Sequence, residues 1–322
     1  MTIPMTPAQA LATRMSAQRL VAPATDLRDV LALQAQDVPA LTTAARNRGL
    51  STDGIRTWAM RGTLHLLHPA DAAWVVRLLG PTSIAAGKRR REQLGLDDGL
   101  CARALEALRE ILVEPKDRPA TVRALAEVGI VLDPKSQAPA HLLAFAANSG
   151  VVHRGLDDTY HLLPKTDPQS DTKSATETGT TNGLPDLFRR YLTAYGPATL
   201  PDFAAWSGLS LRRVRQEIDP DDYADTGFGL VHKGTEPVEP QRRIKLLGHF
   251  DTYLLGYRDR TLALPAEHTA KIQTGGGFLT PHVLLDGLVV GTWREEGGEP
   301  VITPFVPARA AELRRLVGED TR

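Results

Sequence analysis

The chain has 322 residues, 42% of them hydrophobic, which is enough for two or three packed units with a buried core. Its 38 basic and 38 acidic residues cancel, which argues against a protein that coats nucleic acid non-specifically. No window approaches the ~18 uninterrupted apolar residues of a membrane span, and the N-terminus lacks a signal peptide's basic head and apolar run. We therefore expect a cytoplasmic protein, nucleoid-associated in a bacterium, that does not bind a membrane.

Neither metal nor cofactor chemistry is indicated. Cys101 is the only cysteine, which excludes an internal disulfide and a cysteine-rich zinc site, and we expect it to be a small core residue. Because no zinc, iron or phosphate-loop motif is present, no metal and no cofactor is expected.

The N-terminal part, residues 1–95, has the pattern of a winged-helix unit. Apolar spacing predicts helices near residues 8–20, 27–36 and 53–60, followed by a short strand over residues 63–67. Residues 96–166 repeat this order, with helices over 104–112, 121–126 and 138–147 and a two-stranded wing near 151–152 and 160–163. These two parts are predicted to be winged-helix units 1 and 2.

A flexible linker is expected over residues 167–183, which are rich in Ser, Thr and Gly and nearly free of large apolar side chains. A third winged-helix unit is predicted over residues 184–235. Its first helix ends before Gly196, Thr199 caps a second helix, and Ser210 caps a third. This order is typical of a helix-turn-helix, with Arg212, Arg213 and Arg215 on the last, recognition-type helix.

The last part, residues 236–322, is rich in β-branched and alternating runs. Strands are predicted near residues 227–232, 244–247, 278–285, 288–292 and 301–305, with tight turns at 286–287 and 296–299 and a terminal helix over 308–317 packed on them. The whole chain is predicted to be an α+β fold, with three tandem winged-helix units followed by a small β-barrel-like C-terminal domain.

Three basic runs are candidate contacts for DNA phosphates. They are Lys88, Arg89, Arg90 and Arg91; Arg212, Arg213 and Arg215; and Arg242, Arg243 and Lys245. Such a run is more often an ordinary solvated surface than a phosphate clamp, but three runs in one chain favour the clamp somewhat more.

The segment around Gln34-Ala35-Gln36 carries the main candidate chemistry. Leu27, Val30 and Leu31 form an apolar stripe on the predicted helix, and Gln34 takes the next place on it. Pro39 disfavours helix at the residue before it, so the helix should end near Gln36. At an unwinding end both carboxamides can turn toward one cavity. The alternative is that Gln34 caps its own helix and Gln36 is solvated.

Gln34-Ala35-Gln36 resembles the Gln-apolar-Gln motif of the winged-helix DNA glycosylases of the AlkZ type. Further blocks resemble motifs of the same family in the same order: Trp-Ala-Met-Arg-Gly-Thr-Leu-His at residues 58–65, Leu-Gly-His-Phe-Asp-Thr-Tyr-Leu-Leu-Gly-Tyr-Arg-Asp-Arg at 247–260, and the β-rich stretch 275–294. The joint match covers most of the chain. It implies a monofunctional DNA glycosylase that removes N7-alkylated purines, in some members including bulky adducts and interstrand crosslinks.

The resemblance implies that Gln34 and Gln36 are catalytic, with Gln36 orienting the water and Gln34 holding it or the lesion. A related branch has Asp in the place of Gln36. Here Asp37 is one position away, and we interpret it as a partner at a helix end or core edge.

Other residues have two possible roles each. Arg61 and His65 are expected to contact phosphate or the lesion, or, for His65, to be structural. Asp251, Arg258, Asp259 and Arg260 are expected either to form a buried ion network or to contact DNA. His249 has no metal-ligand spacing around it.

Two other functions stay open at this stage. One is a winged-helix regulator that binds an operator without catalysis, and the other is a damage-binding or resistance protein that shields adducts. Regulators usually dimerise to read two half-sites, whereas this chain holds three predicted units and no coiled-coil stripe. We therefore expect a monomer whose partner is duplex DNA carrying alkylated bases.

Overall fold

The computed structural model describes residues 1–164, 182–275 and 278–320. It divides into two compact units. Unit 1 comprises Met1–Thr52, Phe188–Trp206 and Ser210–Arg322, and unit 2 comprises Asp53–Leu187 and Ser207–Leu209. The division into five parts made from the sequence stays a prediction, and nearly all of the predicted linker lies outside the described residues. No helix in the described ranges is long and apolar enough to cross a membrane.

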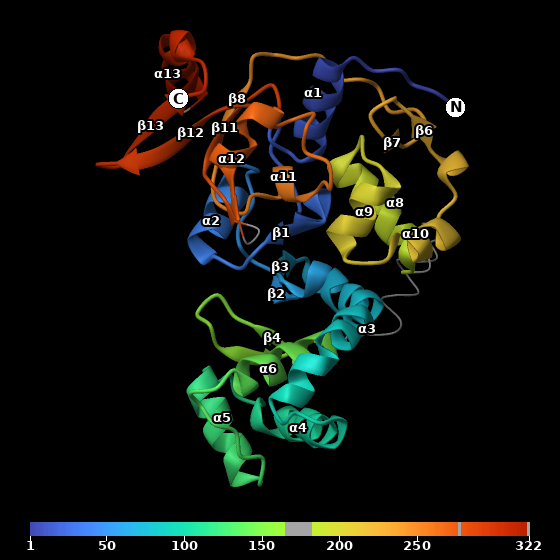
Figure 1. Cartoon of the computed structure of the whole chain (residues 1–322), viewed down its shortest axis with the longest axis vertical. Coiled ribbons are helices and arrows are strands. Elements are labelled where there is room, and N and C mark those ends of the chain that lie inside the picture. The colour runs from blue at the N-terminus through green and yellow to red at the C-terminus, as the bar shows by residue number, and fades with distance from the viewer. Residues whose placement is uncertain (165–181, 276–277, 321–322) are drawn as a thin grey trace. The chain divides into compact units, whose positions relative to one another are not determined.

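Unit 2 begins with a β-hairpin and continues with helices. Its elements in chain order are β2 (Ile55–Trp58), the 3-10 turn η2 (Met60–Gly62), β3 (Leu64–Leu67), α3 (Pro69–Gln93), α4 (Asp98–Ile111), α5 (Arg118–Glu127), α6 (Ala138–Asn148), β4 (Val152–Arg154) and β5 (Tyr160–Leu162) (Figure 1). β2 pairs with β3 and β4 pairs with β5, both antiparallel. Asp97 and Asp117 begin α4 and α5, because their carboxylates accept from backbone N–H groups of the first turn.

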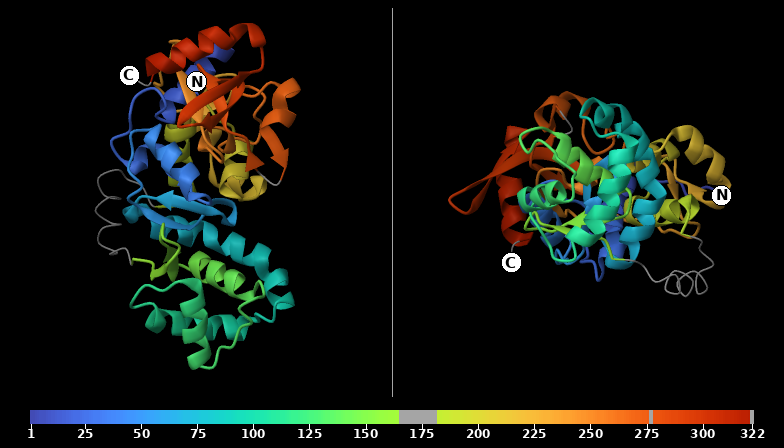
Figure 2. Two further views of the ribbon diagram at one scale, coloured as in Figure 1. Left: turned by 90° about the vertical axis from the view of Figure 1, so that its left-hand side faces the viewer. Right: turned by 90° about the horizontal axis from the view of Figure 1, so that it is seen from below.

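The helices α4, α5 and α6 enclose one apolar core, which the hairpin β4–β5 closes (Figure 2). Leu108, Leu125, Leu142 and Val152 are buried together in it. Cys101 lies in this core, as predicted. The three helices and the two-stranded wing predicted between residues 96 and 166 are thus confirmed as elements.

A close contact between α3 and α6 builds the rest of unit 2. Gly80 of α3 lies so close to α6 that a Cβ added to it would be 2.0 Å from the carbonyl oxygen of Asn148. Pro81 follows inside α3. This 25-residue helix was not predicted from the sequence.

Unit 1 contains the remaining elements. In chain order they are α1 (Pro7–Ala17), η1 (Leu27–Val30), β1 (Ala32–Gln34), α2 (Val38–Arg46), α8 (Leu184–Tyr195, whose first turn falls in the range of unit 2), α9 (Leu200–Ser207), α10 (Leu211–Glu217), η3 (Pro220–Asp222), β6 (Ala224–Asp225), β7 (Leu230–Val231), β8 (Ile244–Leu247), α11 (Thr252–Leu255), η4 (Ala266–His268), α12 (Thr269–Ile272), β9 (Gln273–Gly275), β10 (Phe278–Leu279), β11 (His282–Leu285), β12 (Leu288–Glu296), β13 (Glu299–Pro304), η5 (Pro307–Arg309) and α13 (Ala310–Asp320).

The helix-turn-helix predicted after residue 184 is confirmed as α8, α9 and α10. Thr199 and Asp202 cap α9 reciprocally, each side chain accepting from the backbone N–H of the other. Ser210 caps α10 by accepting from the N–H of Arg213 at 3.3 Å. The rings of Tyr191 and Trp206, tilted at 43° with their centroids 5.0 Å apart, join α8 to α9.

The C-terminal strands form an open, four-stranded antiparallel sheet in the order β13-β12-β11-β8. Both predicted tight turns are confirmed: Asp286 and Gly287 have φ values of 47° and 86°, and Gly297 and Gly298 of 61° and 86°. The terminal helix is confirmed as α13, which packs on the sheet through Leu313 and Leu316 (Figures 1 and 2). The predicted barrel-like domain is wrong, since four short strands are too few to close around a packed interior.

Two of the predicted N-terminal helices are also wrong. Residues 27–36 form the 3-10 turn η1 and the strand β1, because Leu31 has a φ of 63° that no helix accommodates. Residues 53–60 contain the strand β2 instead of a helix. The helix near 8–20 and the strand near 63–67 are confirmed as α1 and β3.

Candidate active site

The glutamine pair lies where β1 ends and α2 begins. Asp26 begins η1 by accepting from the N–H of Arg28 at 2.7 Å, and Leu31 turns the chain into β1. β1 ends at Gln34, and the next helix begins only at Val38. Gln36 therefore belongs to a short connection between a strand and a helix, and not to the frayed end of a helix as predicted.

The two carboxamides are in direct contact. Nε2 of Gln34 donates to Oε1 of Gln36 at 2.9 Å. Gln34 is 5% exposed, whereas Gln36 is exposed to solvent. The alternative in which Gln34 caps its own helix is wrong, because Gln34 ends the strand β1, whereas the exposure of Gln36 agrees with the second part of that alternative. The buried amide of Gln34 thus orients the exposed amide of Gln36. The amide of Gln36 keeps a second lone pair on Oε1 and two N–H donors.

Asp37 begins α2. Its Oδ1 accepts from the N–H of Ala40 at 2.7 Å, and Pro39 occupies the first turn, where a missing N–H costs nothing. This agrees with the interpretation of Asp37 as a partner at a helix end. One of its oxygens is already engaged by the backbone.

Arg61 and His65 lie together in unit 2. His65 is 1% exposed on β3, with Nδ1 2.9 Å from the carbonyl oxygen of Thr63. Burial, followed by the charge of Arg61, lowers the pKa of His65 to about 3. His65 is therefore neutral at physiological pH, and its burial favours the structural role over a DNA contact. Arg61 is half-buried and has a φ of 57°.

The predicted basic runs differ in how far their charges are already paired. On α3, Nζ of Lys88 lies 2.7 Å from Oδ2 of Asp98, and Arg90 donates to Oε1 of Gln137 at 2.7 Å. Arg89 is exposed and makes no ion pair within the part of the chain described. Of these three, Arg89 is the most available to a phosphate.

On α10, Arg213 pairs with Glu217 at 2.8 Å, whereas Arg212 is exposed. In the third run, Arg242 pairs with Glu312. The two arginines of the C-terminal block differ as well: Arg258 is exposed, whereas Arg260 is half-buried and its Nε donates to the carbonyl oxygen of Leu254 at 2.9 Å.

The ion network expected among residues 251, 258, 259 and 260 does not form. Asp251 pairs instead with Arg48, a residue that sequence reasoning missed, with Nη2 2.8 Å from Oδ1. Asp259 accepts from the N–H and hydroxyl of Thr261. Nothing in the pattern around residue 48 could have singled it out, because its partner lies 203 residues away.

Comparison with known proteins identifies the class to which this fold and this glutamine pair belong. The model of the family described as DNA glycosylase AlkZ-like matches residues 27–319. The chain therefore belongs to the AlkZ-like DNA glycosylases and is a DNA glycosylase.

Individual relatives agree. An interstrand DNA cross-link repair glycosylase of Streptomyces sahachiroi is 30% identical over an alignment of 295 positions, which covers 80% of this chain and 76% of that protein. The solved structure of the Streptomyces sahachiroi DNA glycosylase AlkZ superposes with a TM-score of 0.73 at 25% identity and covers 98% of both chains.

Proposed function

We propose that this DNA glycosylase hydrolyses the N-glycosidic bond of N7-alkylated purines in duplex DNA, including bulky adducts and interstrand crosslinks. The observation that carries the proposal is the hydrogen bond between the carboxamides of Gln34 and Gln36, one buried and one exposed. The name of the Streptomyces sahachiroi relative, a cross-link repair glycosylase, supports the extension to crosslinks.

An amide pair suits this substrate because the leaving group needs no proton. Alkylation at N7 makes the base a cation, so the C1′–N9 bond breaks with its electron pair going to N9, and the base leaves neutral. The sugar develops oxocarbenium character, and a water oxygen forms the new bond to C1′ while its proton passes to solvent. The enzyme must hold the water and favour positive charge on the sugar, and amide oxygens can do both.

In this mechanism Gln36 orients the water and Gln34 positions Gln36. The exposed Oε1 of Gln36 accepts one hydrogen bond from Gln34 and can accept a second from a water molecule. Because Gln34 is buried, it holds that oxygen in place before the substrate arrives. Asp37 stays the cap of α2 and has no chemical role.

The DNA backbone is assigned to exposed cations on both units. Arg89, Arg212 and Arg258 are the strongest candidates, since they are exposed and make no ion pair among the residues described. The weaker candidates for a DNA contact are half-buried or have part of the side chain already engaged: Lys88, Arg90, Arg213, Arg61 and Arg260. The helices and hairpins α4–α6 with β4–β5 and α8–α10 with β6–β7 support two units of the proposed winged-helix array, whereas only one of the three helices predicted for the N-terminal unit is a helix.

The decisive experiment is release of free 7-methylguanine from a methylated duplex, followed by chromatography. Replacing Gln36 by Ala should slow release at least about a hundredfold, the usual worth of a residue that positions a reacting proton or water. Gln34→Ala should slow base release less, because Gln36, the residue that contacts the water, remains. Gln241→Ala, an exposed glutamine elsewhere in unit 1, is the matched control and should leave the rate unchanged.

Two results would contradict the proposal. Release at the wild-type rate by Gln36→Ala would remove that residue from the mechanism. Excision of another lesion, with none from any N7-alkylated duplex, would overturn the substrate class while leaving the family assignment intact.

A further inference from the structure

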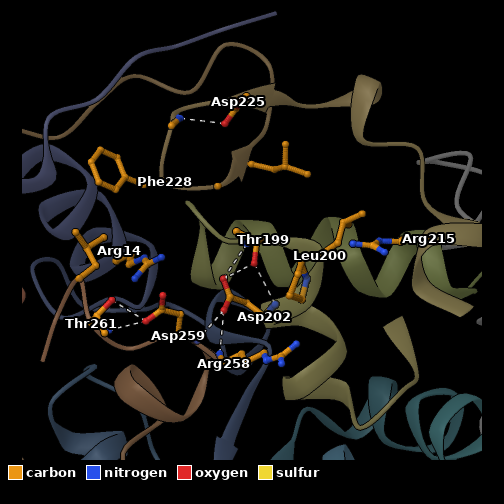
Figure 3. A pocket seen from close by; sticks show the side chains of 15 residues that line it. Arg14, Thr199, Leu200, Asp202, Arg215, Asp225, Phe228, Arg258, Asp259 and Thr261 are labelled. Carbon is orange, nitrogen blue, oxygen red and sulfur yellow. Dashed lines mark hydrogen bonds between the residues drawn. The ribbon is translucent and has the colours of Figure 1, made fainter. Parts of the chain in front are cut away.

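A cavity of about 1060 Å³ in unit 1 lies apart from the glutamine pair (Figure 3). It is bordered by α1, the beginning of α9, the helix α10, the turn between β6 and β7, and the loop after α11. Its charged lining residues are three arginines and three aspartates: Arg14, Arg215, Arg258, Asp202, Asp225 and Asp259. Because the positive and negative side chains are equal in number, charge alone does not indicate which ligand the cavity would bind. The hydrogen bonds that these side chains already make give more information.

Each of the three carboxylates accepts hydrogen bonds from the protein, Asp202 through both oxygens and the exposed Asp225 and Asp259 through Oδ1 alone. Asp202 accepts from the N–H and hydroxyl of Thr199 through Oδ2 and from the N–H groups of Arg258 and Asp259 through Oδ1. Figure 3 draws these bonds converging on Asp202. Asp259 accepts from both donors of Thr261, which also hold its pKa below the usual value. Asp225 accepts from the N–H of Gly227 at 3.0 Å.

The guanidinium groups at the rim, by contrast, are not held by a carboxylate, whereas the charge of the buried Arg14 helps to lower the pKa of Asp259. Neither Arg215 nor Arg258 makes an ion pair through its side chain within the described part of the chain, and both are exposed at the edge of the cavity. The free hydrogen-bonding capacity of the cavity is therefore mainly that of donors. A ligand that suits it carries anionic oxygens.

Arg14 is the buried member of this set. It is 3% exposed, its Nε donates to the carbonyl oxygen of Pro197 at 2.9 Å, and its guanidinium lies 3.9 Å from the ring centroid of Tyr257. Its Nη1 is buried and has no hydrogen-bond partner among the described residues. Because Nη1 is itself closed to solvent, Arg14 would act on an anion in the cavity through its buried positive charge and not through a hydrogen bond from Nη1.

The walls of the cavity are fixed before any ligand arrives. The turn between β6 and β7 is tied to the beginning of α9 by two backbone hydrogen bonds between Ala198 and Leu230, at 3.1 and 2.8 Å. Gly229 approaches so closely that an added Cβ would be 2.6 Å from the carbonyl carbon of Ala198. Phe228, half-buried on this turn, borders the cavity with its ring.

We propose that this cavity binds the phosphates of a nucleotide, with Arg14 as the buried anchor, Arg215 and Arg258 at the rim, and a base against Phe228. The volume is too large for a lone phosphate, and an aromatic side chain beside cationic groups is the usual combination for nucleotides. The nucleotide is either a unit of a DNA strand or a free mononucleotide. The site is independent of the chemistry of Gln34 and Gln36.

The test compares wild type with two variants. Arg215→Ala/Arg258→Ala removes only exposed side chains, so it should fold normally, and Arg14→Lys keeps the buried charge but loses the planar fork. Arg123→Ala, an exposed arginine of α5, is the matched control. Binding of dAMP and of inorganic phosphate is measured by calorimetry, and binding of labelled single-stranded and duplex DNA by fluorescence anisotropy at several salt concentrations.

The two sources of the nucleotide give different results. If DNA supplies the nucleotide, the DNA affinity of the double variant is lower by about tenfold or more, and dAMP shows no saturable binding. The slope of the logarithm of DNA affinity against the logarithm of salt concentration becomes less steep by about 1 to 2. If a free nucleotide supplies it, dAMP binds wild type at a single site, both variants lose at least about tenfold in dAMP affinity, and DNA affinity falls by less than about tenfold, the loss expected from the single backbone contact assigned to Arg258.

Unchanged binding of all four probes to the double variant would overturn the proposal, and so would an equal loss in Arg123→Ala. Gln36→Ala should bind every probe like wild type while releasing base at least about a hundredfold more slowly. Failure at the cavity is therefore distinguishable from failure of the proposed glycosylase mechanism.

Discussion

Arg48 and Asp251 form a bidentate ion pair that is closed to solvent, with Nη2 2.8 Å from Oδ1 and Nη1 2.9 Å from Oδ2. Arg48 also donates to the carbonyl oxygen of Ala44 in α2, and Asp251 caps α11 by accepting from the N–H of Tyr253. The pair therefore joins the end of α2, the helix that begins just after Gln36, to the block 247–260, although its two members are 203 residues apart in the sequence.

Removing one partner of this pair should be strongly destabilising. Arg48→Met leaves the carboxylate of Asp251 buried without its cation, and we expect the free energy of unfolding to fall by about 3–5 kcal/mol. Replacing both partners by Met and Leu should cost less than either single change, because no lone charge remains. Urea denaturation of the three variants measures this, and a double variant less stable than both single variants would contradict it.

His65 should make the protein sensitive to mild acid. Its pKa is about 3 in the folded chain, chiefly because of burial, against 6.5 ordinarily. Between these values the unfolded chain binds a proton that the folded chain does not, so stability is lost as the pH falls below 6.5, by up to about 1.4 kcal/mol per pH unit.

His65→Asn should lose less stability than wild type over this range. Urea denaturation at about pH 7, 6 and 5 in both proteins makes the comparison. Parallel loss in the two proteins would show that His65 is not the group responsible.

The rate of base release should be nearly independent of pH between about pH 5.5 and 8.5, because neither amide ionises there and His65 stays neutral. Single-turnover rates, corrected for spontaneous depurination, measure it. Gln36→Glu should introduce a dependence in which the rate changes as the new carboxyl titrates. A tenfold step per pH unit in wild type would mean that an ionisable base takes part.

Gly80 should be intolerant of even one methyl group. An added Cβ meets the backbone carbonyl of Asn148, which cannot move without separating α3 from α6, so Gly80→Ala should cost more than about 2 kcal/mol. Gly99, on α4, is the matched control, since only side-chain atoms of Asp97 and Arg103 lie within reach of its Cβ. Gly99→Ala should be neutral or slightly stabilising, and thermal melting compares the two.

Much of the fold could be predicted where local chemistry decides it. Ser210 caps α10 and Asp286-Gly287 turns the last sheet because their preferences act over a few residues. The helix α3 could not be predicted, since Gly80 and Pro81 interrupt the helical pattern and the glycine is needed only because α6 lies against it. Long-range packing, invisible in one sequence, decided that element.

The candidate site was predicted in its residues but not in its backbone. Gln34 and Gln36 were expected to face one space, and they are hydrogen-bonded, but they belong to the connection from β1 to α2. The continuous burial from Val30 to Ala35 fits a buried strand as well as a helix, and periodicity cannot separate the two over so few residues. Arg14 and Arg48 were missed because their partners are remote in the chain.

The discontinuity of unit 1 has a consequence for synthesis on the ribosome. Met1–Thr52 is translated first, but the segments it packs with, from Phe188 onward, follow only after the whole core of α4–α6 has emerged. The nascent chain thus completes the core of α4–α6 while α1 still presents Leu11 and Met15 without the later strands that cover them. In that interval the apolar side of α1 is open to contacts with other chains.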